Sequence, residues 1–382
     1  MSISINETTD WKKLTKQGLE TVVDPLVFRC GELFLKGAKN SPSADAVWEL
    51  LNLNIHAIGM FFDALILNEK LPVFNYGDTF DKKLNFDDKV LTKINKLEEN
   101  EQVLYDVDVS YGAYHEVKTA ALAELEKIFN GEQKIPQGMV QQIFRELSVA
   151  EYHWSPSLEN LEARLKTNEE RNIADYMLGG LIFGGYAQQM ESEHLLQPKR
   201  SRLFLAMSLQ SNSAGREVET ELFDELKKRA NSPVFDLPWR PTFFPYLLGK
   251  AENPEEILKE VVKLRHSSQV KDYRQWFAEV IQDWKKNGKI SNQKRNDVKA
   301  IVHSIDQQLG TIPSVPKVEI KVKIAVAIPG EVDLTPTVNR LWGWFLNSLP
   351  GNRYRKLLSR AIVADGEYVK LENRIKTVWS KG

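Results

Sequence analysis

The chain has 382 residues, of which 42% are hydrophobic and 27% charged, and its formal net charge is −1. This length allows one large domain or two to three smaller ones, and the composition is ordinary for a soluble globular protein. The charge excludes a globally basic nucleic-acid-binding protein, although not a local basic patch. The single cysteine, Cys30, excludes an intramolecular disulfide framework. Residues 1–10 show no secretory signal, so we expect a cytoplasmic protein.

Helical patterns dominate the N-terminal region, which we place at residues 1–230. Ser43 is a suitable N-cap for one long helix predicted over about 44–67. Apolar residues cover most of the circumference of this helix and indicate a central, buried position. A further helix is predicted over Tyr114–Phe129, and an alternating apolar pattern at 103–109 predicts a strand before it.

A glycine-containing helix is predicted next along the chain. The sequence Thr167-Asn168-Glu169-Glu170 is typical of a capping box, in which the first and fourth side chains bond each other's backbone N–H groups. The helix that it opens contains Gly179, Gly180, Gly184 and Gly185. Each glycine costs up to about 1 kcal/mol relative to alanine in a helix interior. We therefore expect another backbone or a ligand to approach closely at Gly180 and Gly184, which share one helix face.

Residues 231–251 are predicted to connect two regions. Four prolines in this segment prevent a continuous helix. The segment is also rich in aromatic residues, including Trp239, so we expect it to pack on a neighbouring surface instead of forming a flexible linker. The C-terminal region, 252–382, opens with strong helix signals. Asn253 is the predicted N-cap, followed by Pro254 and two glutamates, and a second helix with one apolar stripe begins near Ser267.

The segment 317–328 gives the clearest strand pattern in the sequence. Its buried face is predicted to consist of Val318, Ile320, Val322, Ile324, Val326 and Ile328. With the strand at 103–109 it predicts a minor β-sheet, in which Asp106 and Asp108 face Lys321 and Lys323. The expected fold is therefore mainly α, a multi-helix, bundle-like architecture with a minor sheet.

The histidines and the cysteine lack the spacing of metal ligands. Only His194 has a glutamate three residues earlier, Glu191, which would place both on one helix face as in half of a di-iron site. The second half is missing, so we expect neither a metal nor a cofactor. His56 and Asp63 lie two turns apart on the 44–67 helix. They are interpreted either as separately satisfied core groups or as an acid and a base lining a cleft.

Two acidic sets suggest a Mg²⁺-dependent phosphodiesterase as an alternative. One set is Asp306, Glu319 and Lys321, and the other is Asp106, Asp108, Glu116 and Lys118. In nucleases of the PD-(D/E)xK type, two acids hold Mg²⁺ and the lysine stabilises the attacked phosphate. A Glu-x-Lys sequence also arises by chance in a charged chain, and an exposed strand face with alternating charges is the simpler explanation.

Two basic clusters are candidate binding surfaces. Lys199, Arg200 and Arg202 form a compact basic turn suited to phosphate, although no phosphate-loop sequence accompanies them. Residues 339–382 hold nine Lys/Arg against three Asp/Glu, a net charge of +6. Their candidate binding residues, which lie near several aromatic side chains, are Arg353, Arg355, Lys356 and Arg360. The simpler explanation of either cluster is a solvated surface.

The sequence does not identify a reaction. We interpret the chain as a non-catalytic interaction or regulatory protein whose basic, aromatic C-terminal surface binds an acidic protein or nucleic acid. The alternatives are a metal-dependent nuclease or phosphodiesterase that uses one of the acidic sets, and a helical protein that binds a small ligand against its glycine-rich helix. The apolar stretch at 47–67 is interrupted by polar residues, which argues against a membrane span.

Overall fold

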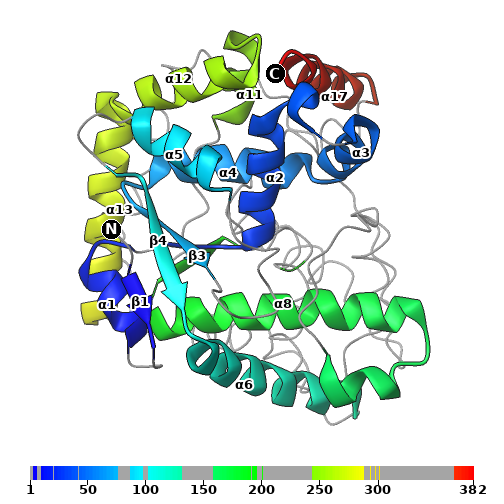
Figure 1. The fold of residues 1–382 in the computed structure, drawn as a ribbon. Coiled ribbons are helices and arrows are strands. Elements are labelled where there is room, and N and C mark those ends of the chain that lie inside the picture. Colours follow the sequence, from blue (N-terminus) through cyan, green and yellow to red (C-terminus); the bar gives the residue numbers. More distant parts are fainter. Residues whose placement is uncertain are drawn as a thin grey trace, which may run out of the picture.

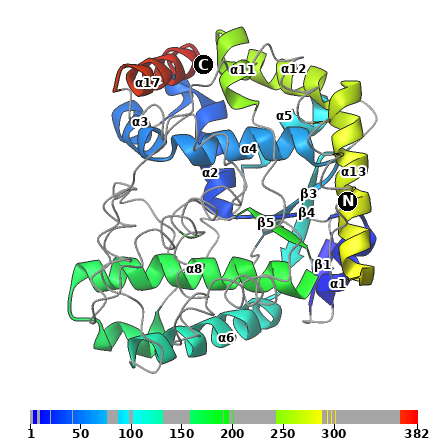
Figure 2. The same cartoon turned by 180° about the vertical axis from the view of Figure 1, so that it is seen from behind.

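The structure is a computed structural model. It describes residues 3–6, 10–19, 21–41, 43–75, 87–97, 102–130, 158–190, 192–195, 200, 243–287, 293, 297, 301 and 365–382. These residues are 75% helical and include two small parallel sheets, so the prediction of a mainly α fold with a minor sheet is confirmed. Figure 1 shows the arrangement, and Figure 2 shows it from behind.

The described helices and strands occur in the following order. The helices are α1 (Trp11–Lys16), α2 (Pro25–Lys36), α3 (Ala44–Leu53), α4 (Ile55–Leu67), α5 (Asp88–Leu97), α6 (Tyr111–Phe129), α8 (Asn168–Met190), α11 (Phe244–Lys250), α12 (Pro254–Arg265), α13 (Ser268–Asn287) and α17 (Asp365–Ser380). Short 3-10 helices lie at Ala38–Asn40 and Glu159–Arg164. The strands are β1 (Ile3–Ile5), β2 (Thr21–Val23), β3 (Leu71–Asn75), β4 (Leu104–Val109) and β5 (Glu193–Leu195).

All described strand pairs are parallel. One sheet has the order β1-β4-β3, and β2 pairs with β5 in another. The strand predicted at 103–109 is confirmed as β4, but its neighbours differ from those predicted. Asp108 pairs with Ser4 of β1 on one side and with Asn75 of β3 on the other. Both edges of β4 are therefore occupied at this position, which leaves no free strand edge beside Asp108 for the predicted pairing. The strand predicted at 317–328 lies outside the described residues.

Buried apolar side chains form two clusters. One cluster lies among β1, α1, α6 and α8, and α6 and α8 run side by side in both views (Figures 1 and 2). The other is built mainly by α2, α4, α11, α12, α13 and α17. The strand β2 contributes to both, because Val22 belongs to the first cluster and Val23 to the second. Successive strand residues point to opposite faces, which explains this division.

The long helix predicted over 44–67 is broken, so this prediction is wrong in part. Its two halves, α3 and α4, meet at Asn54 and are bent by 74°. The Asn54 side chain donates a hydrogen bond to the carbonyl oxygen of Leu50 (2.8 Å), and its backbone N–H bonds Leu51. This local competition with the helical hydrogen-bond pattern explains the break. No single helix in the described parts of the chain is long and apolar enough to cross a membrane, although the bent pair passes that test when both halves are counted.

The predicted capping box is present, and neighbours approach the α8 backbone closely at Gly179 and Gly185. Glu170 N–H donates to Thr167 Oγ1 and Thr167 N–H donates to Glu170 Oε2, each at 3.1 Å. A Cβ on Gly179 would lie 2.5 Å from the guanidinium carbon of Arg200, and one on Gly185 would lie 3.0 Å from a methyl group of Val117 on α6. Two of the four glycines therefore let neighbours approach the α8 backbone, one position away from each of the two predicted glycines.

The described end of the 231–251 segment packs as predicted. Phe243 and Phe244 are fully buried. The Phe243 N–H donates to Asp63 Oδ1 (2.8 Å), and the Phe244 ring stacks on Phe62 with centroids 5.4 Å apart. Asp63 is thus a satisfied core group that anchors this segment to α4. Asn253 caps α12 as predicted, since its side chain accepts from the backbone N–H of Glu256; Trp239 lies outside the described residues.

Candidate anion-binding pocket

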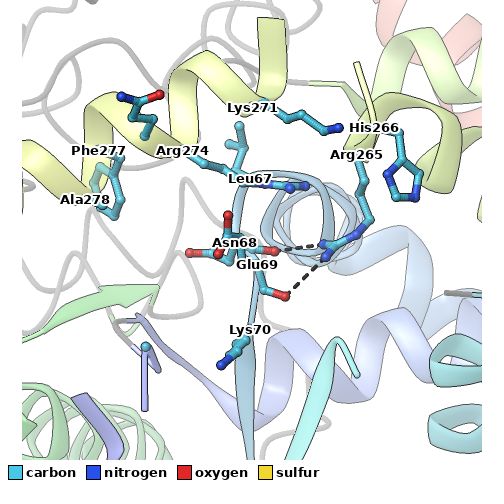
Figure 3. Close-up of a pocket in the computed structure, with 12 residues that line it drawn as sticks. Leu67, Asn68, Glu69, Lys70, Arg265, His266, Lys271, Arg274, Phe277 and Ala278 are labelled. Atoms are coloured by element: carbon cyan, nitrogen blue, oxygen red, sulfur yellow. Dashed lines mark hydrogen bonds between the residues drawn. The ribbon is translucent and has the colours of Figure 1, made fainter. Parts of the chain in front are cut away.

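A cavity of about 480 Å³ opens where the end of α4 meets the junction of α12 and α13. The turn from α4 into β3 forms one side, and the first half of α13 forms another (Figure 3). We call it the basic pocket, and its lining residues are Gly18, Leu67, Asn68, Glu69, Lys70, Arg265, His266, Lys271, Arg274, Gln275, Phe277 and Ala278. Lys70, Arg265, Lys271 and Arg274 are cationic, and Glu69 is the one carboxylate in this set.

The two arginines of the basic pocket, Arg265 and Arg274, bind the C-terminal end of α4. Arg265 is only 2% exposed, and its guanidinium donates to the carbonyl oxygens of Leu65, Asn68 (2.8 Å) and Glu69 (3.2 Å). Figure 3 shows the bonds to the last two. Arg274 donates through Nη2 (2.6 Å) and Nε (3.1 Å) to the carbonyl oxygen of Ile66. The last carbonyls of a helix lack partners within it and carry partial negative charge, so both arginines satisfy and neutralise this end.

The two lysines are placed differently. The half-buried Lys70 donates to the backbone carbonyl of Gln17 (3.1 Å) and lies 5.5 Å from the centroid of the Tyr105 ring. Lys271 is exposed in the first turn of α13, and its ammonium group makes no hydrogen bond or ion pair with any residue that the structure describes. Lys271 is therefore the pocket cation with the greatest freedom to bind a ligand.

One wall of the pocket is apolar. Leu67 is 2% and Phe277 8% exposed, and both belong to the core that holds α4 and α13 together. Ala278 extends this wall by one residue. Positions 271, 274, 275 and 278 follow helical spacing, so α13 presents a single face to the cavity. The pocket thus combines cationic groups with a firm apolar surface, which is typical of small-molecule sites.

Asp106, Asp108, Glu116 and Lys118, the acidic set near β4, do not form the metal-binding cluster that a nuclease would need. Asp106 accepts a hydrogen bond from Asn75 (3.2 Å), and Asp108 is exposed at the end of β4. Glu116 is exposed on α6, whereas Lys118 is 8% exposed and pairs with Glu159 (2.9 Å). Within the described ranges, no group of three or more His, Cys, Asp or Glu side chains is arranged to hold a metal ion. The second acidic set, Asp306, Glu319 and Lys321, lies outside them.

His194 lies in a strand, whereas the Glu191/His194 spacing predicted a shared helix face. Helix α8 ends at Met190, and His194 lies in β5, paired with Val22 of β2. His194 is therefore not on a helix face, and Glu191 lies outside the described residues.

Arg200 is the one member of the predicted basic surfaces whose surroundings the structure describes. It is fully buried, and its Nη1 bonds Asp24 Oδ1 at 2.6 Å. Its guanidinium lies 5.6 Å from the centroid of the Phe183 ring. This placement indicates a structural role instead of a solvated phosphate-binding turn. The other predicted binding residues lie outside the described residues, namely Lys199, Arg202, Trp239, Arg353, Arg355, Lys356 and Arg360.

The surroundings of the Asp24–Arg200 pair are apolar and unreactive. Burial raises the pKa of the Tyr176 hydroxyl to about 12. Burial also raises the pKa of the Cys30 thiol far above its ordinary value, and the nearby Asp24 carboxylate adds to this effect. Both groups therefore stay protonated near neutral pH, and Cys30 is not an activated nucleophile.

The described part of the basic C-terminal region uses its cations within the molecule. Arg374 of α17 donates to the carbonyl oxygens of Leu248 and Ala251, each at 2.7 Å. Lys376 lies 5.3 Å from the centroid of the Trp48 ring, and Lys381 pairs with Glu252 at 3.2 Å. Three of the nine basic residues counted in 339–382 thus contribute to the packing of α17.

The basic pocket was not predicted from the sequence because its walls come from distant segments. Gly18, residues 67–70 and the α12–α13 junction are separated by about 50 and 200 positions. One local signal existed. Helix α13 has no acidic residue in its first turn and carries Lys271 there, whereas α12 has Glu255 and Glu256 in its first turn. A cation in the first turn does not complement the helix dipole, but α1 has the same arrangement with Lys12 and Lys13, so this pattern alone does not identify a site.

Comparison of the chain with protein family models, with curated proteins and with solved structures gave no match.

Proposed function

We propose that the protein binds a small anionic ligand in the basic pocket and acts as a binding protein. The observation that supports this proposal is a cavity of about 480 Å³ lined by four cationic side chains and one carboxylate. Small-molecule sites have volumes of about 300–1,000 Å³. A positive field in a hollow surface attracts anions and concentrates them locally.

The geometry favours binding in two further ways. The arginines offset the negative end of the α4 dipole, which would otherwise repel an anion. Their bonds to Ile66, Asn68 and Glu69 also fix the shape of the pocket floor. A site that is ordered before the ligand arrives loses less conformational entropy on binding. The remaining cation, Lys271, is free to turn towards a ligand.

Calorimetric titration at low ionic strength tests this function. Inorganic phosphate, phenyl phosphate and phthalate are titrated into the protein, and we expect at least one to bind. Lys271→Gln should weaken that binding at least about fivefold, because one charge contact is lost. Lys259→Gln is the matched control, since Lys259 is an exposed lysine on α12 that does not line the pocket. Addition of 0.5 M NaCl should weaken binding to the parent protein by screening.

Absence of binding by all three anions would overturn the proposal. Equal weakening by Lys271→Gln and Lys259→Gln would also overturn it, because the affinity would then reflect general surface charge.

Recognition of an acidic protein or nucleic acid by the C-terminal basic residues is a second proposal. It is supported by the net charge of +6 over 339–382. The triple variant Arg353→Glu, Lys356→Glu and Arg360→Glu should lose most partner recovery in a pull-down while it keeps the parent's thermal unfolding. Full recovery by the folded triple variant would contradict this proposal.

A further inference from the structure

We infer that the ligand of the basic pocket is a phosphate monoester whose organic part is apolar or aromatic. This inference rests on the proposed binding function and names the chemical class of the ligand. Three features of the pocket support it: the kind of cation left for the ligand, the change of polarity along α13, and the position of Lys271.

Lys271, which makes no hydrogen bond or ion pair with a described residue, is a cation of a kind that binds phosphate. The fork of an arginine matches carboxylate and phosphate alike, through two parallel hydrogen bonds, whereas a lysine binds phosphate as a point charge. Both pocket arginines already donate to backbone carbonyls of the α4 end. Lys271 instead offers a compact charge with three donors, which suits oxygens arranged tetrahedrally around phosphorus. Lys70 adds a second ammonium group from the β3 side of the pocket (Figure 3).

The polarity of the lining changes along α13. Lys271 and Arg274 come first, and Phe277 and Ala278 follow. Seven residues of helix span about 10 Å, so the cationic and apolar ends of this wall are separated by roughly the length of a substituted benzene ring. Inorganic phosphate would occupy only the cationic end. A ligand that carries an apolar group beside its phosphate would fill both.

The position of Lys271 supports an anion near the first turn of α13. Helix N-termini favour negative charge, yet this turn has Lys271 and no acidic residue. The neighbouring α12 follows the usual pattern, with Glu255 and Glu256 at its start and Lys263 and Arg265 at its end. A dianionic phosphate beside Lys271 would interact favourably with both the ammonium group and the helix end.

The test compares two ligands with the same ring and charge. Phenyl phosphate and phthalate each carry one benzene ring and two negative charges near pH 8, and inorganic phosphate lacks the ring. Calorimetry on the full chain should show phenyl phosphate binding at least about tenfold more tightly than either of the others.

Two variants separate the phosphate end from the organic end. Lys271→Gln should reduce the affinities for phenyl phosphate and inorganic phosphate by similar factors. Ala278→Gln should weaken the binding of phenyl phosphate at least about fivefold, because the longer side chain occupies the apolar end of the pocket. The affinity for inorganic phosphate should not change. Lys259→Gln serves as control and should change neither affinity.

The outcomes distinguish this inference from the proposed function. If phthalate binds as tightly as phenyl phosphate, the pocket binds anions but does not select phosphate, and the inference is wrong. If inorganic phosphate binds as tightly as phenyl phosphate, the claim that the ligand carries an apolar or aromatic group is wrong. If none of the three binds, the proposed function fails as well.

Discussion

At the scale of single residues, the Asp24–Arg200 ion pair joins two segments that lie far apart in the sequence. Both side chains are fully buried, and Asp24 also caps α2 by accepting from the backbone N–H of Leu26 (2.9 Å). Removing two charges from water is costly, and a buried pair recovers this cost only while both partners are present. Loss of one partner therefore leaves a lone buried charge.

We expect Arg200→Met to destabilise the protein by about 3–5 kcal/mol, because the Asp24 carboxylate then stays buried without its cation. Adding Asp24→Asn should restore part of that loss, since asparagine is neutral and is also a good helix cap. Urea unfolding of both single variants and the double variant measures the coupling. Additive effects would show that the two side chains do not depend on each other.

Lys271 allows a second prediction at this scale, made for the protein without ligand. Lys271→Glu should raise the free energy of unfolding by about 0.3–1 kcal/mol, because a carboxylate in the first turn of α13 complements the helix dipole. Lys271→Gln should fall between the parent and the glutamate variant. Thermal unfolding in a phosphate-free buffer measures the difference. Destabilisation by Lys271→Glu would mean that Lys271 supports the fold.

At the scale of secondary-structure elements, the packing of Arg200 against α8 depends on the absence of a side chain at Gly179. Gly179→Ala should destabilise the protein, because the new Cβ would need the space of the Arg200 guanidinium, which its bond to Asp24 holds in place. Gly249→Ala on α11 is the matched control. A Cβ at position 249 would have no neighbour within 4 Å, so alanine should stabilise that helix by up to about 1 kcal/mol. Chemical denaturation compares the two, and stabilisation by both would contradict the close approach at Gly179.

Helices α2 and α5 are joined by a charged contact with a defined pH dependence. Lys36 Nζ lies 2.7 Å from both Asp87 Oδ2 and Glu32 Oε1. The hydrogen bond from Lys36 lowers the pKa of the Asp87 carboxyl. Burial disfavours the charged form of Lys36, but hydrogen bonds to Asp87 and Glu32 outweigh it and raise the pKa of the ammonium group.

Asp87→Asn tests this contact, because asparagine keeps the cap on the N–H groups of Lys89 and Val90 but loses the charge. Because the pKa of Asp87 is lowered in the folded protein, its contact with Lys36 contributes fully to stability above pH 3.8, the ordinary pKa. This contribution is lost as the pH falls through the lower pKa of the folded state. Because the pKa of Lys36 is raised in the folded protein, its contribution to stability is fully present below pH 10.5 and is lost as the pH rises through the folded value, which lies above 10.5. The stability gap between parent and variant should therefore be constant from about pH 5 to 9 and shrink outside these limits. A gap that is unchanged at pH 3 would contradict the assignment.

The sequence predicted those elements whose signals are local. The capping box at Thr167, the N-cap at Asn253 and the alternating pattern of β4 each depend on a few adjacent residues, and all three are present. The break at Asn54 was missed because the apolar pattern continues through it, and the Asn54 bonds to Leu50 and Leu51 at the break leave no periodic signal. The strands β1, β2 and β5 have three residues each, too few for a periodic pattern.

At the scale of the whole molecule, α17 completes the core around α2 and α11. Ile375 and Val378 are fully buried. Trp379 stacks on Trp48 at a centroid distance of 5.9 Å, and its Nε1 donates to the carbonyl oxygen of Leu33 at 3.3 Å. Residues more than 300 positions apart in the sequence therefore share one apolar cluster. Neither this contact nor the basic pocket has a local sequence signal that identifies its partner.

We expect Trp379→Ala to cost about 3–5 kcal/mol, because it leaves a large cavity and removes the bond to Leu33. Thr377→Ala is the control on the same helix, since Thr377 is exposed and its hydroxyl donates to the carbonyl oxygen of Asn373, one turn earlier in α17. Guanidinium unfolding followed by tryptophan fluorescence and by circular dichroism gives both values. Equal stability of the two variants would show that α17 does not contribute to the core.

The two arginines that hold the end of α4 also affect the order of events during synthesis. The carbonyls of Ile66 and Asn68 precede Arg274 and Arg265 by about 200 residues. A ribosome adds about 5–20 residues per second, so the end of α4 waits about 10–40 s for its partners. During this interval the apolar surface of α4 that later contacts α12 and α13 is uncovered on the nascent chain. The end of α4 can therefore reach its described arrangement only after Arg265 and Arg274 have been synthesised.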